Sequence, residues 1–206
     1  MSNNSNTKTN KTLVLFDFDG TITVGDSYLQ FIIFSVGIPR FIWGILLTSP
    51  YILLYTIKLL SNAEAKQRVT KNFFQGWDEK IFHDKSKQFV EQRLDGMLRK
   101  EMVEKIIAHK NSGHDIYVVS ASFEEYLQYW TDKMGIQLIG TRLETLQGKL
   151  TGHFKTLNCH GPQKVLRIQG KIDLSQYAKI IAYGDSKGDR EMLGLAQEKY
   201  YKGIKL

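Results

Sequence analysis

The chain has 206 residues, 42% of them hydrophobic and 24% charged, so it suits one α/β domain with an insertion or two small domains. Its 28 Lys and Arg against 21 Asp and Glu give a formal net charge of +7, which favours anionic partners: phosphorylated metabolites, anionic lipid or nucleic acid. Cys159 is the single cysteine, which excludes an intrachain disulfide and a cysteine-based zinc site.

Residues 1–11 are rich in Ser, Asn, Thr and Lys, a composition that predicts a disordered tail. No apolar segment follows a basic start, so the sequence predicts no signal peptide and a cytoplasmic protein. The positive net charge leaves peripheral contact with an anionic membrane open as an alternative.

A buried strand is expected at residues 12–16, an apolar run with β-branched and aromatic members. It delivers two carboxylates, Asp17 and Asp19, to its C-terminal end, where ligands bind in open α/β sheets. These carboxylates repel each other unless a cation lies between them or one of them is protonated. Gly20 lets the backbone turn sharply and bring N–H groups to a bound anion. This strand end therefore offers a nucleophile, an acid/base, a metal site and an anion site.

Residues 28–57 form an unusually apolar segment in which Arg40 is the only charged side chain. The uncharged part, residues 41–57, contains Pro50 and is shorter than the roughly 20 residues that a membrane-spanning helix needs. We therefore expect a set of short helices packed into a helical subdomain. An apolar surface that contacts a membrane or an apolar substrate stays open as the alternative.

Apolar residues at helical spacing predict three further helices before the sheet resumes. The first contains Ala65, Val69, Phe73 and Phe74, the second Phe89, Leu94, Met97 and Leu98, and the third Met102, Val103, Ile106 and Ile107. We expect a helical insertion at residues 24–105, within an α/β core formed by residues 12–23 and 106–206.

The remaining chain alternates between expected strands and helices. Strands are expected at residues 115–120, 137–139, 179–183 and 199–201, and helices at residues 123–134, 161–170 and 189–195. A β-hairpin around Gln147-Gly148 is expected at residues 141–154. This alternation predicts an α/β fold with a parallel central sheet and right-handed crossovers.

Polar groups of complementary chemistry follow three of the expected strands and one helix start. They are Asp17 with Asp19, then Ser120, then Lys164, and finally Asp185 with Asp189. In a parallel sheet these groups share one rim. Carboxylate oxygens are the hard ligands that Mg²⁺ takes, while Lys and Ser donate to phosphoryl oxygens. The set predicts a magnesium and phosphoryl site.

These motifs resemble those of the haloacid dehalogenase superfamily of phosphohydrolases. Asp17-Phe18-Asp19-Gly20-Thr21 matches the first motif, Ser120 the second, Lys164 the third, and Gly184-Asp185-Ser186 with Asp189 the fourth. The stretch from Asn158 to Lys164 is similar to the Asn-Cys-x-Gly-x-x-Lys of the phosphoserine-phosphatase-like subfamily IB. The resemblance covers all but residues 1–11. It implies a Rossmann-like α/β core with a helical C1 cap inserted after the first motif.

The resemblance also implies a role for each matching residue. Asp17 is the implied nucleophile, and Asp19 is the implied acid and base. The Asp17 carboxylate, the Asp19 carbonyl and Asp185 are the implied Mg²⁺ ligands. Asp189 is expected to orient the metal ligands or Lys164. The implied phosphate-binding residues are Gly20, Ser120, Ala121 and Lys164.

Three departures from phosphoserine phosphatases disfavour phosphoserine as the substrate. Ser120-Ala121-Ser122 replaces their usual Ser-Gly-Gly, and Gly188 replaces an asparagine in the fourth motif. Asp26 stands where they usually carry a glutamate that reads the substrate's amino group, and it is equally suited to capping a helix.

We expect a Mg²⁺-dependent phosphomonoesterase that forms an aspartyl phosphate and acts on a small or amphipathic phosphate ester. The alternatives are a lipid-phosphate phosphatase resembling phosphatidylglycerophosphatases, a histidinol-phosphate or phosphoserine phosphatase, and a phosphate-responsive binding protein without activity. Nucleic-acid binding is not expected, because no basic run with interleaved aromatic residues occurs.

Overall fold

The computed structural model describes residues 11–206. The expected tail lies outside these residues except for Lys11, which is instead the first residue of strand β1. The main sheet has the strand order β3-β2-β1-β6-β7-β8. Its members are β1 (Lys11–Phe16), β2 (Asp115–Phe123), β3 (Gln137–Thr141), β6 (Tyr177–Gly184), β7 (Glu198–Tyr201) and β8 (Ile204–Lys205). All neighbouring strands are parallel except β7 and β8, which confirms the predicted α/β class.

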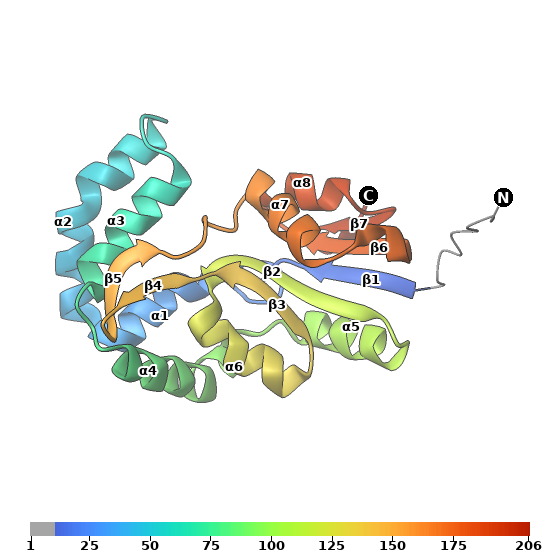
Figure 1. Ribbon diagram of the computed structural model, residues 1–206, viewed down its shortest axis with the longest axis horizontal. Helices are drawn as coiled ribbons and strands as arrows, with labels where there is room; N and C mark the ends of the chain where they lie inside the picture. The colour runs from blue at the N-terminus through green and yellow to red at the C-terminus, as the bar shows by residue number, and fades with distance from the viewer. Residues whose placement is uncertain (1–10) are drawn as a thin grey trace.

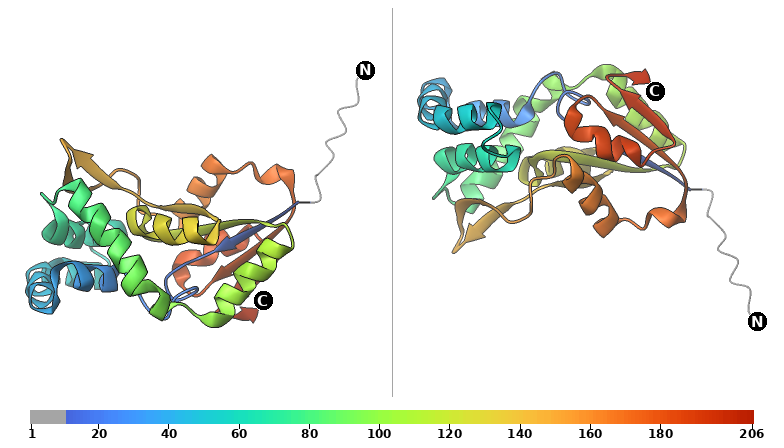
Figure 2. Two further views of the ribbon diagram at one scale, coloured as in Figure 1. Left: turned by 90° about the horizontal axis from the view of Figure 1, so that it is seen from below. Right: turned by 90° about the horizontal axis from the view of Figure 1, so that it is seen from above.

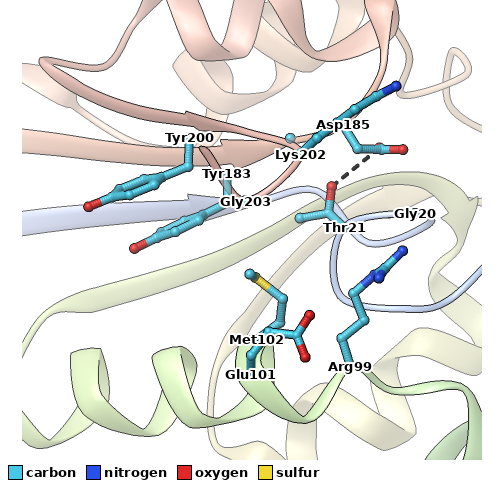
Figure 3. A pocket seen from close by; sticks show the side chains of 11 residues that line it. Gly20, Thr21, Arg99, Glu101, Met102, Tyr183, Asp185, Tyr200, Lys202 and Gly203 are labelled. Atoms are coloured by element: carbon cyan, nitrogen blue, oxygen red, sulfur yellow. Dashed lines mark hydrogen bonds between the residues drawn. The ribbon is translucent and has the colours of Figure 1, made fainter. Parts of the chain in front are cut away.

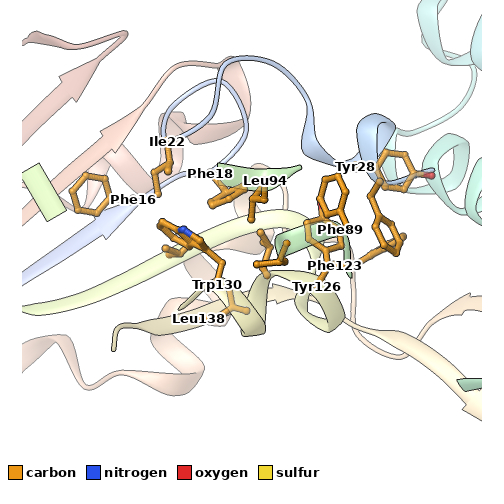
Figure 4. Packing of buried hydrophobic residues seen from close by; sticks show 14 of the residues in the cluster. Phe16, Phe18, Ile22, Tyr28, Phe89, Leu94, Phe123, Tyr126, Trp130 and Leu138 are labelled. Carbon is orange, nitrogen blue, oxygen red and sulfur yellow. The ribbon is translucent and has the colours of Figure 1, made fainter. Parts of the chain in front are cut away.

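Helices cover both faces of this sheet (Figure 1). One face carries α5 (Lys100–Asn111) and α6 (Glu124–Met134), and the other carries α7 (Pro162–Lys171) and α8 (Arg190–Gly194). Alternate residues of β1 divide between the two cores: Val14 and Phe16 join one hydrophobic cluster, Leu13 and Leu15 the other. Figure 4 shows part of the first cluster, in which Phe16, Phe18 and Trp130 pack together.

Four helices and a hairpin lie beyond the carboxyl ends of β1 and β2 (Figures 1 and 2). The helices, called the helical insertion below, are α1 (Ser27–Val36), α2 (Ile38–Thr56), α3 (Asn62–Phe74) and α4 (Glu79–Gln92). As predicted, a hairpin pairs β4 (Leu143–Leu146) with β5 (Lys149–Phe154) around Gln147 and Gly148. Both turn residues have positive φ. Phe31 of α1 packs among the rings of Phe74, Phe82, Phe89 and Tyr126 and so ties the insertion to α6.

The expectation of several short helices in residues 28–57 is wrong for α2, which runs through Pro50 as one helix of 19 residues. Proline lacks the N–H that would bond the carbonyl four residues earlier, here that of Leu46. The Ser49 hydroxyl donates to this carbonyl instead, at 2.8 Å. Among the described residues, α2 is the one helix that is long and apolar enough to cross a membrane, judged by length and composition alone. Only 11% of its apolar segment is buried.

The expectation that one helix contains both Phe89 and Leu98 is also wrong. The helix α4 ends at Gln92, and a 3-10 turn, η1 (Leu94–Met97), follows it. Leu98 then forms an antiparallel bridge with Thr23, and Val24 N–H donates to the Met97 carbonyl at 2.7 Å. The expected boundary at residue 105 falls inside α5. Two more 3-10 turns, η2 (Leu174–Gln176) and η3 (Lys187–Asp189), complete the described elements.

Candidate active site

A buried lysine joins the ends of three neighbouring strands. Lys164, in the first turn of α7, donates to Asp17 Oδ1 at 2.5 Å, to Asp189 Oδ1 at 2.6 Å and to the Val119 carbonyl at 2.8 Å. Only 2% of Lys164 is exposed. Such a charge is tolerated in the interior because it is paired and fully hydrogen-bonded.

The protonation of these three groups follows from burial and from their pairing. Burial raises the pKa of Asp17 to about 7, although the Lys164 ammonium opposes this shift. Burial also disfavours the ionised form of Asp189, but attraction by Lys164 prevails and lowers its pKa. For Lys164 burial favours the neutral amine, and the two carboxylates outweigh it and raise its pKa. A bound cation would therefore strongly favour the ionised form of Asp17.

Asp19 lies beside Asp17 but has its own partners. Its Oδ1 accepts the Ser27 N–H at 2.6 Å, and its Oδ2 accepts the Ser122 hydroxyl at 2.5 Å. These partners come from the start of α1 and from the end of β2. They fix the carboxyl group in place and separate it from the pairs around Lys164.

Ser120 lies buried in β2, and its hydroxyl oxygen accepts the Ser122 N–H at 2.9 Å. The hydroxyl hydrogen is therefore free to donate to a ligand. A cavity of about 450 Å³ opens above these groups. Of the residues predicted for the site, it is lined by Asp17, Asp19, Asp26, Ser120, Ala121, Lys164 and Asp189.

Gly20 and Asp185 line a neighbouring hollow of about 350 Å³ instead (Figure 3). Gly20 has φ +82°, the conformation for which glycine is suited, and a Cβ there would collide with the Asp185 carboxylate. Between the two spaces, the Thr21 hydroxyl lies 3.1 Å from Asp17 Oδ2 and 3.3 Å from Asp185 Oδ1. Asp185 thus approaches Asp17 from the side opposite Lys164.

Asp17, Asp185 and Asp189 each place an oxygen within 4.8 Å of the others, close enough to share a cation. Asp189 is less suited, because Lys164 occupies its Oδ1 and the Ser186 N–H and hydroxyl occupy its Oδ2. Asp185 is a better donor: burial first and then Asp189 raise its pKa, as for a carboxylate that lacks a counter-ion. Two such hard oxygen donors fit Mg²⁺.

Lys66 and Ser122 are among the residues of the cavity that were not predicted for the site. Lys66 of α3 donates to the Ala121 carbonyl at 2.8 Å, and its Nζ lies 4.3 Å from the centre of the Tyr28 ring. Burial lowers its pKa, against the attraction of Asp19 and Asp26. No pattern in one sequence distinguishes this lysine from a surface lysine. Ser122 could have been found, because alternate residues of a strand point the same way and Ser120 was already singled out.

Asp26 caps α1, and its side chain accepts the Leu29 N–H at 3.0 Å. It also lines the cavity, and burial raises its pKa, with Asp19 adding to the shift. The capping role anticipated for Asp26 is therefore confirmed. A role in reading the substrate stays a prediction.

The far wall of the cavity is apolar and comes from the helical insertion. It is formed by Ile45, Ile52 and Tyr55 of α2, Ala65 and Val69 of α3, and Tyr28 and Leu29 of α1. One end of the cavity thus suits an anion and the other suits an apolar group.

The chain has relatives among known proteins. CicA from Caulobacter vibrioides is 31% identical over 192 residues, which cover 92% of this chain and 85% of the relative. A probable phosphatase of Mycobacterium tuberculosis is 30% identical over 196 residues, covering 89% of this chain and 66% of the relative.

Solved structures show the same fold. A protein with unknown function from Bordetella pertussis Tohama I has a TM-score of 0.78 at 20% identity, over 93% of this chain and 89% of that chain. A phosphoserine phosphatase, solved as a phospho-aspartyl intermediate analogue, has a TM-score of 0.61 at 22% identity, over 93% of this chain and 86% of that chain. The family model of haloacid dehalogenase-like hydrolases matches residues 14–194. The chain therefore belongs to the haloacid dehalogenase-like hydrolase family.

Proposed function

We propose that this hydrolase is a Mg²⁺-dependent phosphatase that cleaves phosphate monoesters through an aspartyl phosphate at Asp17. The observation that carries the proposal is the buried Asp17–Lys164–Asp189 set at the floor of a cavity, with Asp19 and Ser120 beside it. The relative described as a probable phosphatase supports the same class.

In the first step, an Asp17 carboxylate oxygen attacks phosphorus, and the bond from phosphorus to the ester oxygen breaks. Asp19, in its protonated form, gives its proton to the leaving oxygen. The Ser27 N–H and the Ser122 hydroxyl hold Asp19 in position for this transfer. The products of the step are an alcohol and the phosphorylated Asp17.

In the second step, Asp19 takes a proton from water while the water oxygen bonds to phosphorus. The bond from phosphorus to Asp17 breaks, which releases inorganic phosphate and restores the carboxylate. Lys164 and the free hydroxyl hydrogen of Ser120 stabilise the charge on the phosphoryl oxygens in both steps.

The carboxylates of Asp17 and Asp185, with the main-chain carbonyl of Asp19, would hold Mg²⁺. When bound, the ion offsets the repulsion between the Asp17 carboxylate and the phosphoryl oxygens. The raised pKa values of Asp17 and Asp185 support this assignment, because each carboxylate lacks a nearby cation sufficient to offset its burial.

We also propose that residues 24–105 act as a cap over the core formed by residues 12–23 and 106–206. Two hydrogen bonds support a cap that contacts the core: Lys66 of α3 donates to the Ala121 carbonyl at 2.8 Å, and Asn158 of the core donates to Asn62 Oδ1 of α3 at 2.9 Å. The cap then supplies the apolar wall of the cavity and Lys66. The core supplies the groups that react.

The proposed substrate is a small or amphipathic phosphate ester. The apolar wall of Ile45, Ile52 and Val69 favours a second candidate, a lipid-phosphate monoester whose chain lies along this wall. Lys66 is placed to pair with a second anionic group of either substrate. Phosphoserine is too small and too polar to use the wall.

Phosphate release from a panel of esters tests the proposal. The panel contains p-nitrophenyl phosphate, phosphoserine, histidinol phosphate, lysophosphatidic acid and phosphatidylglycerophosphate, each with Mg²⁺. Wild type is expected to turn over at least one ester, and Asp17→Asn none. The exposed Asp84, on α4, provides the matched control Asp84→Asn, which should keep full activity. Equal activity of the Asp17→Asn and Asp84→Asn variants would contradict the proposal.

A further inference from the structure

We propose that the outer face of α2 docks onto the surface of an anionic lipid bilayer. The outer face is defined by six apolar side chains that are each 50% or more exposed: Ile38, Ile42, Trp43, Leu46, Leu47 and Leu53. Their spacing along the helix gathers them on one side of it. Apolar exposure of this extent on one helix marks an interaction surface rather than scattered surface residues.

The opposite side of α2 already has its partner, α3. Phe41 stacks on Phe73 with ring centres 6.0 Å apart, and a Cβ on Gly44 would collide with the Phe73 ring. Further along, the Arg68 guanidinium lies 5.1 Å from the centre of the Tyr51 ring. A helix that is apolar all round belongs in a protein core or in lipid. Since α3 covers only one side, the outer face is the part of α2 that the described residues leave uncovered.

Charge selects an anionic bilayer as the partner. From residue 27 to residue 63 the charged side chains are Arg40 and Lys58, with no carboxylate among them. Arg40 and Lys58 lie near the two ends of α2, and both are exposed. An apolar stripe between exposed cations suits the headgroup region of anionic lipids, where each Lys or Arg adds to the attraction.

The packing of α2 indicates that it lies in the plane of the surface. With 19 residues, α2 is about 28 Å long, close to the thickness of a bilayer core. However, α3 runs alongside it and carries Glu64, Lys66, Arg68 and Lys71. Spanning the bilayer would bury these charges in hydrocarbon, whereas lying on it immerses only the outer face.

Docking in this way brings the cavity to the bilayer. Ile45 and Ile52, which line the cavity, are each the sequence neighbour of an outer-face residue, Leu46 and Leu53. One helix therefore offers apolar surface both to the bilayer and to the cavity. This consequence rests on the proposed function: a phosphate ester could pass between the bilayer and the cavity without exposing its hydrocarbon tail to water.

Vesicle flotation tests the docking surface. Wild type is expected to float with vesicles of phosphatidylcholine and phosphatidylglycerol, more weakly at high salt, and to stay unbound with phosphatidylcholine alone. Leu46→Glu should weaken binding at least about tenfold, since it replaces a buried apolar contact by a charge. Leu166 on α7, 58% exposed against 59% for Leu46, gives the matched control Leu166→Glu, which should bind as wild type. Equal effects of the two variants would overturn the proposal.

Fluorescence locates the contact independently of any variant's folding. Of the three tryptophans, Trp43 is 58% exposed, Trp77 is partly buried against the core and Trp130 is 1% exposed, so docking should shift the Trp43 part of the wild-type emission to the blue and allow its quenching by brominated lipid. An unchanged emission spectrum would count against docking. If sedimentation shows a dimer and the protein does not bind vesicles, the outer face is instead an interface with a second copy of the chain.

The readouts separate docking from catalysis. Asp17→Asn should bind vesicles as wild type, and Leu46→Glu should hydrolyse soluble p-nitrophenyl phosphate at the wild-type rate. Vesicle binding without hydrolysis would remove the proposed function alone, and hydrolysis without binding would remove the docking surface alone.

Discussion

The ammonium group of Lys164 donates to Asp17 just after β1, to the Val119 carbonyl within β2 and to Asp189 of η3, the turn that follows β6. Asp17 pairs with this buried cation, whereas Asp19 accepts the Ser27 N–H and the Ser122 hydroxyl. These separate partners support the proposed division of roles, with Asp17 as the nucleophile and Asp19 as the acid. The proposed chemistry therefore depends on the hydrogen-bond partners of single residues.

Asp19→Asn should lower turnover of alkyl phosphates by roughly 10²–10⁴, because the leaving oxygen loses its proton donor. Phosphorylation by an aryl phosphate should suffer less, because a phenolate leaves without a proton. Single-turnover burst measurements on both substrates provide the comparison. Equal losses in the first step would show that Asp19 is not the acid.

Glu125 of α6 should make folding stability depend on pH. Burial raises its pKa from 4.5 to about 7, and its Oε1 accepts the Leu143 N–H at 2.8 Å. Between pH 4.5 and 7 the folded protein keeps a proton that the unfolded chain has lost, so this contribution to stability falls as pH rises and is fully lost above pH 7.

Glu125→Gln cannot ionise and keeps the acceptor, so it should unfold at a higher temperature than wild type at pH 8, by about 7–14 °C, with no gain near pH 4. Calorimetry at both pH values measures this, with the exposed Glu104→Gln as control. A gain of the same size at both pH values would contradict the shifted titration.

The helix α2 shows which features of the structure could be predicted from the sequence and which could not. The places of β1, β2, β3, β6 and β7, the hairpin and the four motifs were predictable, because apolar runs, the Gln147-Gly148 turn and carboxylate spacing are local signals. The strands β2 and β3 nevertheless run three and two residues beyond their expected ends. The continuity of α2 was not, because it depends on Ser49 replacing the N–H that Pro50 lacks. The end of α4 at Gln92 was not either, since the bridge from Leu98 to Thr23 joins segments far apart in the sequence.

The same limit applied to the site. The places of Asp17 and Lys164 in the cavity were predictable from motifs, whereas Lys66 reaches the cavity only because α3 folds over β2. The separation of Gly20 from the main cavity likewise depends on the path of the loop after β1. Residues that reach a site from the helical insertion thus require the tertiary structure to be found.

Gly44→Ala tests how closely α2 and α3 pack. Helix propensity alone would favour alanine by about 1 kcal/mol. The added methyl group would meet the buried Phe73 ring, and this overpacking should cost about 1–3 kcal/mol, so the net effect should be a loss of about 0–2 kcal/mol. Urea unfolding measures the loss, with Ile42→Ala, at a position 54% exposed on the same helix, as the control. A stabilised Gly44→Ala protein would show that the two helices lie farther apart.

At the scale of the whole molecule, the sheet and the helical insertion meet at the carboxyl ends of the strands (Figure 1). Asp17 and Asp185 come from opposite ends of the sequence, after β1 and β6, and meet only in the folded state. Any cation that binds both must therefore stabilise the fold as a whole.

Mg²⁺ at about 100 times its dissociation constant should stabilise the protein by about 2.7 kcal/mol, which corresponds to about 5–10 °C in Tm. Asp185→Asn should abolish this rise, and Ca²⁺ should not restore activity after EDTA treatment, because it prefers more ligands and looser geometry. Thermal unfolding with and without each ion measures both effects. An unaltered Mg²⁺ response in Asp185→Asn would remove Asp185 from the metal site.

Phosphorylation of Asp17 during turnover is the most direct test of the proposed mechanism. The enzyme is mixed with Mg²⁺ and an aryl phosphate, quenched with acid within one turnover, digested and mapped by mass spectrometry. We predict a phosphoryl group on the peptide containing Asp17 in wild type and none in Asp17→Asn, which should keep its fold because its side-chain volume is preserved. Turnover without phosphorylation of Asp17, or wild-type turnover by Asp17→Asn, would contradict the mechanism.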